Sequence, residues 1–140
     1  MTMELQLGIS FTATMTVTNK DLALHQGSGD LPVLATPRMM ALMEHAAMMA
    51  VKTQLDEGQT TVGAHIESSH LTPTPEGSTI TATAILTAVE GRKLTFDIEA
   101  QDAQGNILGK GSHTRFIVDR NKFMSKIAQY SLCPNVSNNA

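Results

Sequence analysis

The chain has little cysteine and few aromatic side chains. Its 140 residues include one cysteine, four phenylalanines, one tyrosine and no tryptophan. The single cysteine, Cys133, excludes an intrachain disulfide, and nothing around it in the sequence would make its thiol a nucleophile. This cysteine usage is typical of a protein of the reducing cytoplasm, which we take as its expected location. Few rings are available to stack bases, and the formal net charge of −3 argues against nucleic acid as a partner.

Long apolar runs are also missing. No stretch is long enough to span a bilayer, and the N-terminus lacks a basic segment followed by an apolar core, so we expect neither a membrane partner nor a secretory signal. The sequence contains no GxSxG elbow, Walker loop or GxGxxG motif. No pair of its five histidines has HxH or HExxH spacing, so the sequence predicts no metal site. The histidines are His25, His45, His65, His70 and His113.

The pattern of apolar residues predicts one strand, one long helix and then four extended segments. Thr36 is a good N-cap, and Pro37 is favoured in the first turn, so the helix should run from Pro37 to about Asp56 and end at Gly58. Glu90-Gly91 and residues 103–106 resemble tight turns, which makes the last three strands an antiparallel meander. The expected strands are 11–18, 60–72, 78–89, 92–101 and 106–118, with a loop at 25–33 and a short helix at 119–130.

One antiparallel sheet wrapped around one long apolar helix satisfies this order of elements. It is the hot-dog arrangement, an α+β fold, and we expect a single domain over residues 1–130 with a disordered tail at 131–140. A single copy would leave a sheet edge open, and members of this fold normally join two sheets edge to edge. The sequence therefore predicts a homodimer.

Three side chains in the first half of the chain suggest a hydrolytic site: the hydroxyl of Thr36, the carboxylate of Glu44 and the imidazole of His70. Glu44 lies inside an apolar helical run, where a carboxylate is costly unless it is partnered or used. The alternatives are a Glu44 at the edge of the helix that reaches solvent, and a Thr36 that only caps the helix. The free N–H groups of the first helical turn could also stabilise an oxyanion.

Two features of the later strands leave alternatives open. His65 and His70 are five residues apart in one extended segment, so only one of them can face the helix. Gly109 and Gly111 share a strand face with His113 and Arg115, which indicates either a close approach by a backbone or ligand, or a bend in the sheet.

Basic side chains gather toward the C-terminus. Residues 91–140 hold seven of the ten lysines and arginines but four of the thirteen acidic residues. This distribution suits a small phosphorylated ligand, although an ordinary solvated surface would look the same.

Several segments resemble the fluoroacetyl-CoA thioesterase family of hot-dog proteins. The resemblance covers roughly residues 5–127, and its specific segments are 35–46, 61–77, 89–94 and 109–115. It implies an acyl-CoA thioesterase that acts as a homodimer, with coenzyme A present only as part of the substrate. It further implies that Thr36, Glu44 and His70 form the catalytic triad, that Gly63 supplies a backbone donor at the thioester, and that Arg115 helps bind the ligand.

The roles within this triad stay open at the level of sequence. Thr36 is the nucleophile or positions water, Glu44 is base, orienter or nucleophile, and His70 is general base or acid. The fluoroacetyl-specific enzyme carries phenylalanines in the loop before the helix, whereas residues 27–33 have none. The prediction is therefore a general short- or medium-chain acyl-CoA thioesterase. The alternatives are a non-catalytic acyl-CoA-binding module and an enoyl-CoA hydratase of the same fold.

Overall fold

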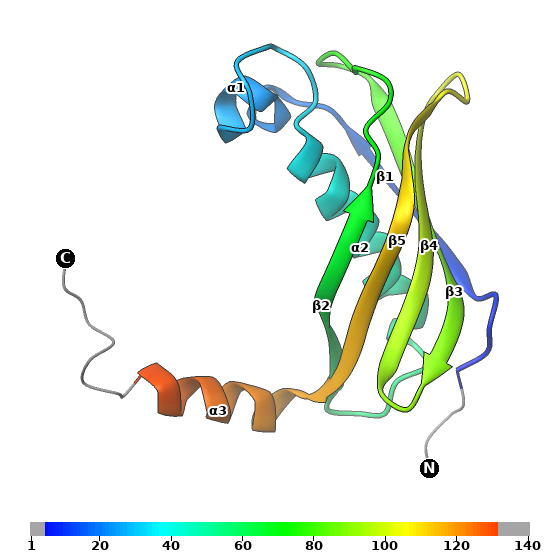
Figure 1. The fold of residues 1–140 in the computed structure, drawn as a ribbon, viewed down its shortest axis with the longest axis vertical. Coiled ribbons are helices and arrows are strands. Elements are labelled where there is room, and N and C mark those ends of the chain that lie inside the picture. The colour runs from blue at the N-terminus through cyan, green and yellow to red at the C-terminus, as the bar shows by residue number, and fades with distance from the viewer. Residues whose placement is uncertain (1–4, 132–140) are drawn as a thin grey trace.

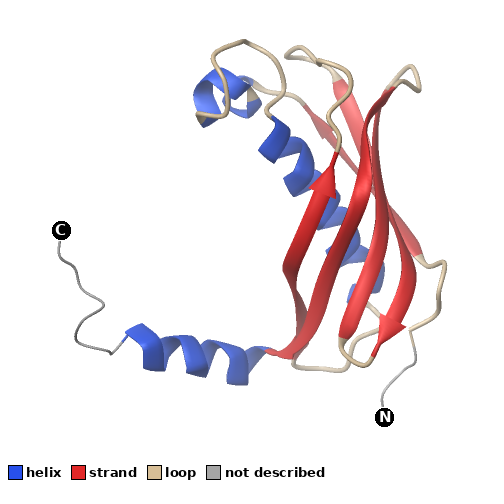
Figure 2. Ribbon diagram, in the orientation of Figure 1, coloured by secondary structure: helices blue, strands red, loops and turns tan. Residues whose placement is uncertain are grey.

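One helix lies across a curled antiparallel sheet in the computed structural model, which describes residues 5–131 (Figures 1 and 2). The five strands have the order β1-β3-β4-β5-β2, so β1 and β2 form the two edges. The strands are β1 (Ser10–Thr16), β2 (Gln59–Ser68), β3 (Thr79–Glu90), β4 (Lys93–Asp102) and β5 (Ile107–Asp119). The helices are α1 (Ala23–Gln26), α2 (Thr36–Lys52) and α3 (Arg120–Ser131), with a 3-10 turn at Asn19–Asp21.

The core forms between α2 and the inner face of the sheet. Along β3, alternate residues Ile80, Ala82, Ala84 and Leu86 are fully buried, as period-2 alternation predicts. Alanines also line the buried side of α2, where they allow the helix to approach the sheet closely. The buried residues of α2 are Met39, Leu42, Met43, Ala46, Ala47, Ala50 and Val51. The predicted hot-dog architecture is confirmed.

Several elements differ in their bounds from the sequence prediction. Helix α2 ends at Lys52, not near Asp56, because the N–H of Gln54 bonds to the carbonyl of Val51 at 2.9 Å and tightens the chain into a turn. The short helix α1 lies at the start of the region expected to be a loop, and β2 ends at Ser68. Ser131 closes α3 and does not belong to a tail. The rest of the predicted tail, with Cys133, lies outside the described residues.

The end of β2 passes unusually close to β5. A Cβ on Gly111 would clash with the carbonyl of Glu67, and one on Gly109 would clash with the carbonyl of Ser69. Beyond β2, the N–H of Ser69 still bonds to the carbonyl of Lys110 at 2.9 Å. Of the two alternatives for these glycines, the structure thus shows close approach by a backbone, which guides the chain toward the start of α2.

Helix α3 leaves the body of the molecule at the end of β5 and projects beyond the β2 edge (Figure 1). No helix in residues 5–131 is both long enough and apolar enough to cross a membrane.

Candidate active site

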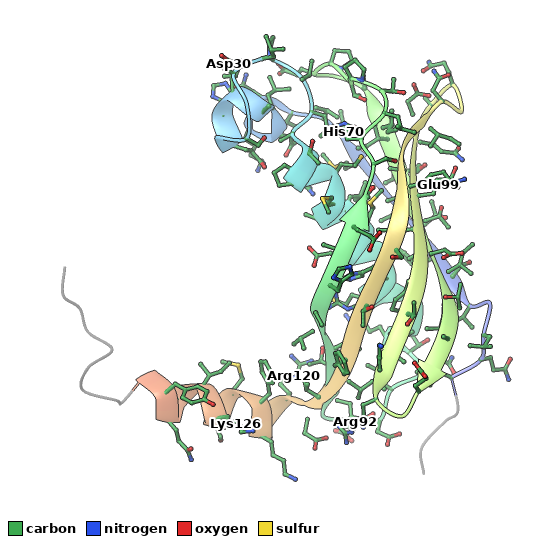
Figure 3. The ribbon with its side chains drawn as sticks, viewed as in Figure 1. Asp30, His70, Arg92, Glu99, Arg120 and Lys126 are labelled. Carbon is green, nitrogen blue, oxygen red and sulfur yellow. The ribbon has the colours of Figure 1, made fainter. Side chains whose placement is uncertain are left out.

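Thr36 and His70 meet at the start of α2. The Thr36 hydroxyl lies 2.6 Å from Nδ1 of His70, which is carried there by the segment that follows β2 (Figure 3). The N-cap of α2 is Ala35, which makes no side-chain cap bond, and Thr36 is the first helical residue. The prediction that Thr36 is the N-cap is wrong by one position. Because its hydroxyl bonds to His70 and not to the helix backbone, it is available for chemistry.

Few backbone donors are free in the first turn of α2. Pro37 has no N–H, and the N–H groups of Arg38 and Met39 bond to the carbonyl of Ala35 at 3.0 and 3.1 Å. The N–H of Thr36 is therefore the remaining donor of this turn. The expected stabilisation of an oxyanion by several helix N–H groups reduces to that single group.

His70 has one ring nitrogen in use and one without a partner. Its Nε2 is buried and has no hydrogen-bond partner in the described structure. Burial lowers the pKa of His70 below the ordinary value of 6.5, which favours the neutral ring. A neutral ring that accepts the Thr36 hydroxyl proton at Nδ1 carries its own proton on Nε2. This buried donor would gain an acceptor from a substrate or another protein group.

Glu44 belongs to a second group of residues around Gly63. Its carboxylate oxygen Oε2 lies 2.9 Å from the place that a Cβ on Gly63 would occupy, and His113 and Arg115 approach the same place at 3.3 and 3.5 Å. The absence of a side chain on Gly63 therefore leaves a small space bounded by a carboxylate, an imidazole and a guanidinium. Glu44 itself is partly buried, so it is neither fully enclosed nor freely solvated.

The guanidinium of Arg115 is buried, with 7% of the residue exposed. Its Nε donates to the Thr61 hydroxyl at 2.8 Å, and its Nη2 donates to the Thr61 carbonyl at 3.0 Å. Burial lowers the pKa of Arg115, while the charge of Glu44 raises it. No carboxylate forms an ion pair with Arg115 in residues 5–131, so part of its charge stays available for an anionic or polarised ligand.

His113 holds Arg115 from the other side. Its Nε2 lies 3.2 Å from Nη1 of Arg115, and its Nδ1 lies 2.7 Å from the carbonyl of His65. The consistent assignment is a neutral ring that donates from Nδ1 and accepts at Nε2. Burial is the main cause that lowers the pKa of His113, which agrees with that assignment. Sequence reasoning placed His113 beside Arg115 but missed its contact with the guanidinium, and it missed Thr61, because both depend on strand register.

Within one chain, the predicted residues thus fall into two groups. Eight residues of α2 separate Thr36 from Glu44, which corresponds to about 12 Å along the helix axis. Glu44 makes no hydrogen bond with Thr36 or His70 in this structure, although all three are described. One group is the pair Thr36 and His70, and the other comprises Gly63, Glu44 and Arg115.

The structure also shows which of His65, in β2, and His70, after β2, faces the helix. His65 is exposed and bonds to Glu67 at 3.0 Å, whereas His70 faces the helix. Among residues 5–131, no three His, Cys, Asp or Glu side chains gather as metal ligands would.

Comparison with known proteins assigns the family. A model of the family described as fluoroacetyl-CoA-specific thioesterase matches residues 17–121, which include both groups of site residues. The chain belongs to this family. The fluoroacetyl-CoA thioesterase of Streptantibioticus cattleyicolor is 39% identical to it over 97 residues, which are 69% of each chain.

Solved structures of this thioesterase family and of other hot-dog proteins share the fold. A structure of the fluoroacetyl-CoA thioesterase FlK superposes with a TM-score of 0.83 at 32% identity, over 90% of this chain and 97% of that one. A thioesterase superfamily member from Thermus thermophilus superposes with a TM-score of 0.85 at 23% identity, over 91% of this chain and 94% of that one. At 23% identity, the similarity to the Thermus thermophilus protein shows a shared fold and nothing more.

Proposed function

We propose that this member of the fluoroacetyl-CoA thioesterase family hydrolyses short- or medium-chain acyl-CoA thioesters to the free acid and coenzyme A. Family membership supports thioester hydrolysis. The observation that carries the assignment of residues is the 2.6 Å contact between the Thr36 hydroxyl and a neutral His70. A hydroxyl hydrogen-bonded to a neutral imidazole can lose its proton as it attacks, or can orient a water that does so.

The chemistry requires an attacking oxygen, an oxyanion site and a proton for the leaving thiolate. His70 accepts the proton of the attacking Thr36 hydroxyl, or of a water that Thr36 orients, and returns it to the sulfur of coenzyme A as the C–S bond breaks. Where Thr36 is the nucleophile, a water that gives its proton to His70 then hydrolyses the acyl-Thr36 ester, and His70 returns that proton to the Thr36 oxygen as the free acid leaves. The backbone N–H of Gly63 and the guanidinium of Arg115 stabilise the charge that develops on the carbonyl oxygen. No cofactor beyond the coenzyme A of the substrate takes part.

A homodimer would bring the two groups of residues together. Strand β2 is a sheet edge, and Gly63, Ala64 and His65 in its middle are exposed. If two β2 edges pair antiparallel about a two-fold axis at His65, His70 of one copy lies opposite Thr60 of the other, three residues before its Gly63. The buried Nε2 donor of His70 can then reach Glu44 of the second copy, which completes a Thr–His–Glu arrangement.

The test is a thiol-release assay over a series of acyl-CoA chain lengths. We expect Glu44→Gln and His70→Ala each to lower kcat by about 10²–10⁴-fold while the dimer stays folded. His25→Ala is the matched control, because His25 is exposed, lies in α1 and belongs neither to the two groups of site residues nor to the β2 edge. Near-wild-type turnover in both single variants would show that the proposed residues are not the site.

The same assay separates the rival functions. Release of free thiol from a saturated acyl-CoA indicates a thioesterase, whereas hydration of an enoyl-CoA without thiol release indicates a hydratase. Binding of acyl-CoA without either product indicates a binding module. We place the activity in the cytoplasm, with neither nucleic acid nor membrane as a partner.

A further inference from the structure

The segment that contains β2 contributes to the site at two positions that a regular strand would turn to opposite faces. Gly63 faces α2, because a Cβ on it would lie 2.9 Å from Oε2 of Glu44. His70 also faces α2, because its Nδ1 lies 2.6 Å from the Thr36 hydroxyl. The two positions are seven residues apart, and side chains an odd number of residues apart in an extended segment point to opposite faces. A regular strand therefore cannot present both of them to the helix.

The pairing of β2 with β5 is irregular between these two positions. Gly63 pairs with Arg115, whereas His65 pairs with Thr114, so the register shifts by one residue. Ala64 is the extra residue, and the irregularity is a β-bulge. Because the side-chain period of a strand is two residues, a shift by one turns every later side chain to the other face.

The new alternation continues beyond the bulge as far as His70. Residues 66–71 alternate between partly buried and exposed, with the even-numbered positions directed inward. The strand pairing also continues after β2 ends, since the N–H of Ser69 bonds to the carbonyl of Lys110 at 2.9 Å. The inward position of His70 therefore depends on the bulge.

His113 of β5 holds the bulge in place. Its ring is buried, with 1% of the residue exposed, and its Nδ1 lies 2.7 Å from the carbonyl of His65, the first residue after Ala64. On the far side of the bulge, Nη2 of Arg115 donates to the carbonyl of Thr61 at 3.0 Å. A shift of β2 along β5 would break the bond to His113 and leave a buried polar group without a partner, which is costly.

We propose that His113 is a positioning residue of the thioesterase reaction, whose hydrogen bond to the His65 carbonyl fixes the bulge at Ala64 that turns Gly63 and His70 to the same face. The proposal rests on the proposed function, because it takes Gly63 and His70 to act on the thioester. It assigns no proton transfer to His113, which acts through the backbone of β2.

Three substitutions separate this bond from the other contacts of the ring. His113→Asn keeps an N–H donor near the position of Nδ1, His113→Gln keeps a polar group near Nε2 only, and His113→Phe keeps a ring with neither. For His113→Phe and His113→Gln we expect kcat to fall about 100-fold, as misplaced reacting groups typically cause. For His113→Asn we expect kcat within about tenfold of the wild type, and KM should change by less than about threefold in all three variants.

A control distinguishes positioning from a general loss of stability. Ile80→Ala removes a fully buried side chain in β3, with β4 and β5 between it and β2. It should lower the free energy of unfolding in urea and leave kcat unchanged. If His113→Phe does not fold, the comparison of His113→Asn with His113→Gln decides the proposal.

NMR measures the strand register without any substrate, which keeps this proposal separate from the proposed function. Cross-strand contacts between backbone protons should pair His65 with Thr114 in the wild type and in His113→Asn, and this pairing should be lost in His113→Phe. A wild type that hydrolyses no acyl-CoA overturns the proposed function, and the register then judges whether His113 fixes the bulge.

Three results would overturn the positioning role of His113. The first is an unchanged pairing of His65 with Thr114 in His113→Phe together with full kcat. The second is a His113→Asn enzyme as slow as His113→Gln. The third is a fall of kcat in Ile80→Ala as large as that in His113→Phe, which would make the effect one of stability.

Discussion

At the scale of single residues, the hydroxyl of Thr36 bonds to His70. It does not cap the helix, because Ala35 occupies the N-cap position. Removal of this hydroxyl should therefore affect chemistry without removing a helix cap. We expect Thr36→Val, which keeps the branched shape, to lower kcat by about 10²-fold or more, whereas Thr36→Ser retains most activity. Thermal unfolding of both variants checks that the fold is kept. A Thr36→Val enzyme with full turnover would exclude a chemical role for the hydroxyl.

His113, which is buried, and His70, which is partly buried, predict how activity and stability depend on pH. Burial lowers the pKa of His70 and His113 from the ordinary value of 6.5, so their folded forms resist protonation. Below about pH 6.5 the unfolded chain binds more protons than the folded one, and the free energy of unfolding should fall as the pH falls. Above that pH both states are neutral at these rings, and the contribution levels off. Activity should decline on the same acidic side, since a protonated His70 cannot accept a proton.

Urea denaturation between pH 5 and pH 8, alongside kcat/KM over the same range, measures both effects. Stability that rises on acidification would contradict this account.

At the scale of elements, the glycines of β5 position the segment that carries His70. A side chain on Gly111 would clash with the carbonyl of Glu67, and overpacking of this kind typically costs about 1–3 kcal/mol. We expect Gly111→Ala to lower both the free energy of unfolding and kcat. Gly29→Ala is the control for stability, because its Cβ would meet its nearest neighbour, Ala23, at an ordinary 3.4 Å. Equal stability of the two variants would show that close approach at Gly111 is unimportant.

The loop before α2 should determine the selectivity for the acyl group. Residues 27–33 contain no aromatic side chain that could close over a fluorinated acetyl group. We therefore expect similar kcat/KM values for acetyl-CoA and fluoroacetyl-CoA. A preference of many thousand-fold for the fluorinated substrate, on the order of 5 kcal/mol in transition-state binding, would show that selectivity arises elsewhere.

The helices and strands also show what could and could not be predicted from the sequence. Alternation in β3 and the apolar stripe of α2 identified the sheet and its helix, because both patterns reflect burial within a few residues. The end of α2 and the place of Thr36 were missed by one to four residues, since backbone bonds from Gln54, Arg38 and Met39 decide them. The sequence and the resemblance named Thr36, Glu44 and His70 as one site. Their division into two groups depends on helix length and strand register, which no local pattern contains.

At the scale of the whole molecule, the exposed edge of β2 and the separation of the two groups both favour a dimer. If the fold is completed by a second copy, its apparent stability must depend on protein concentration. We expect the Tm to rise with concentration over the micromolar range, and light scattering to give twice the mass of one chain. A single-chain mass with a constant Tm would exclude the assembly.

Helix α3 has few neighbours in its own chain, yet it carries four partly exposed apolar side chains: Phe123, Met124, Ile127 and Tyr130. Twelve residues are at or below the length at which an isolated helix is marginal in water. The persistence of this helix must then depend on whatever covers those side chains, and its amide protons would exchange with solvent slowly only while they are covered. The rate of amide hydrogen exchange in α3 would therefore report the fraction of the protein that is assembled.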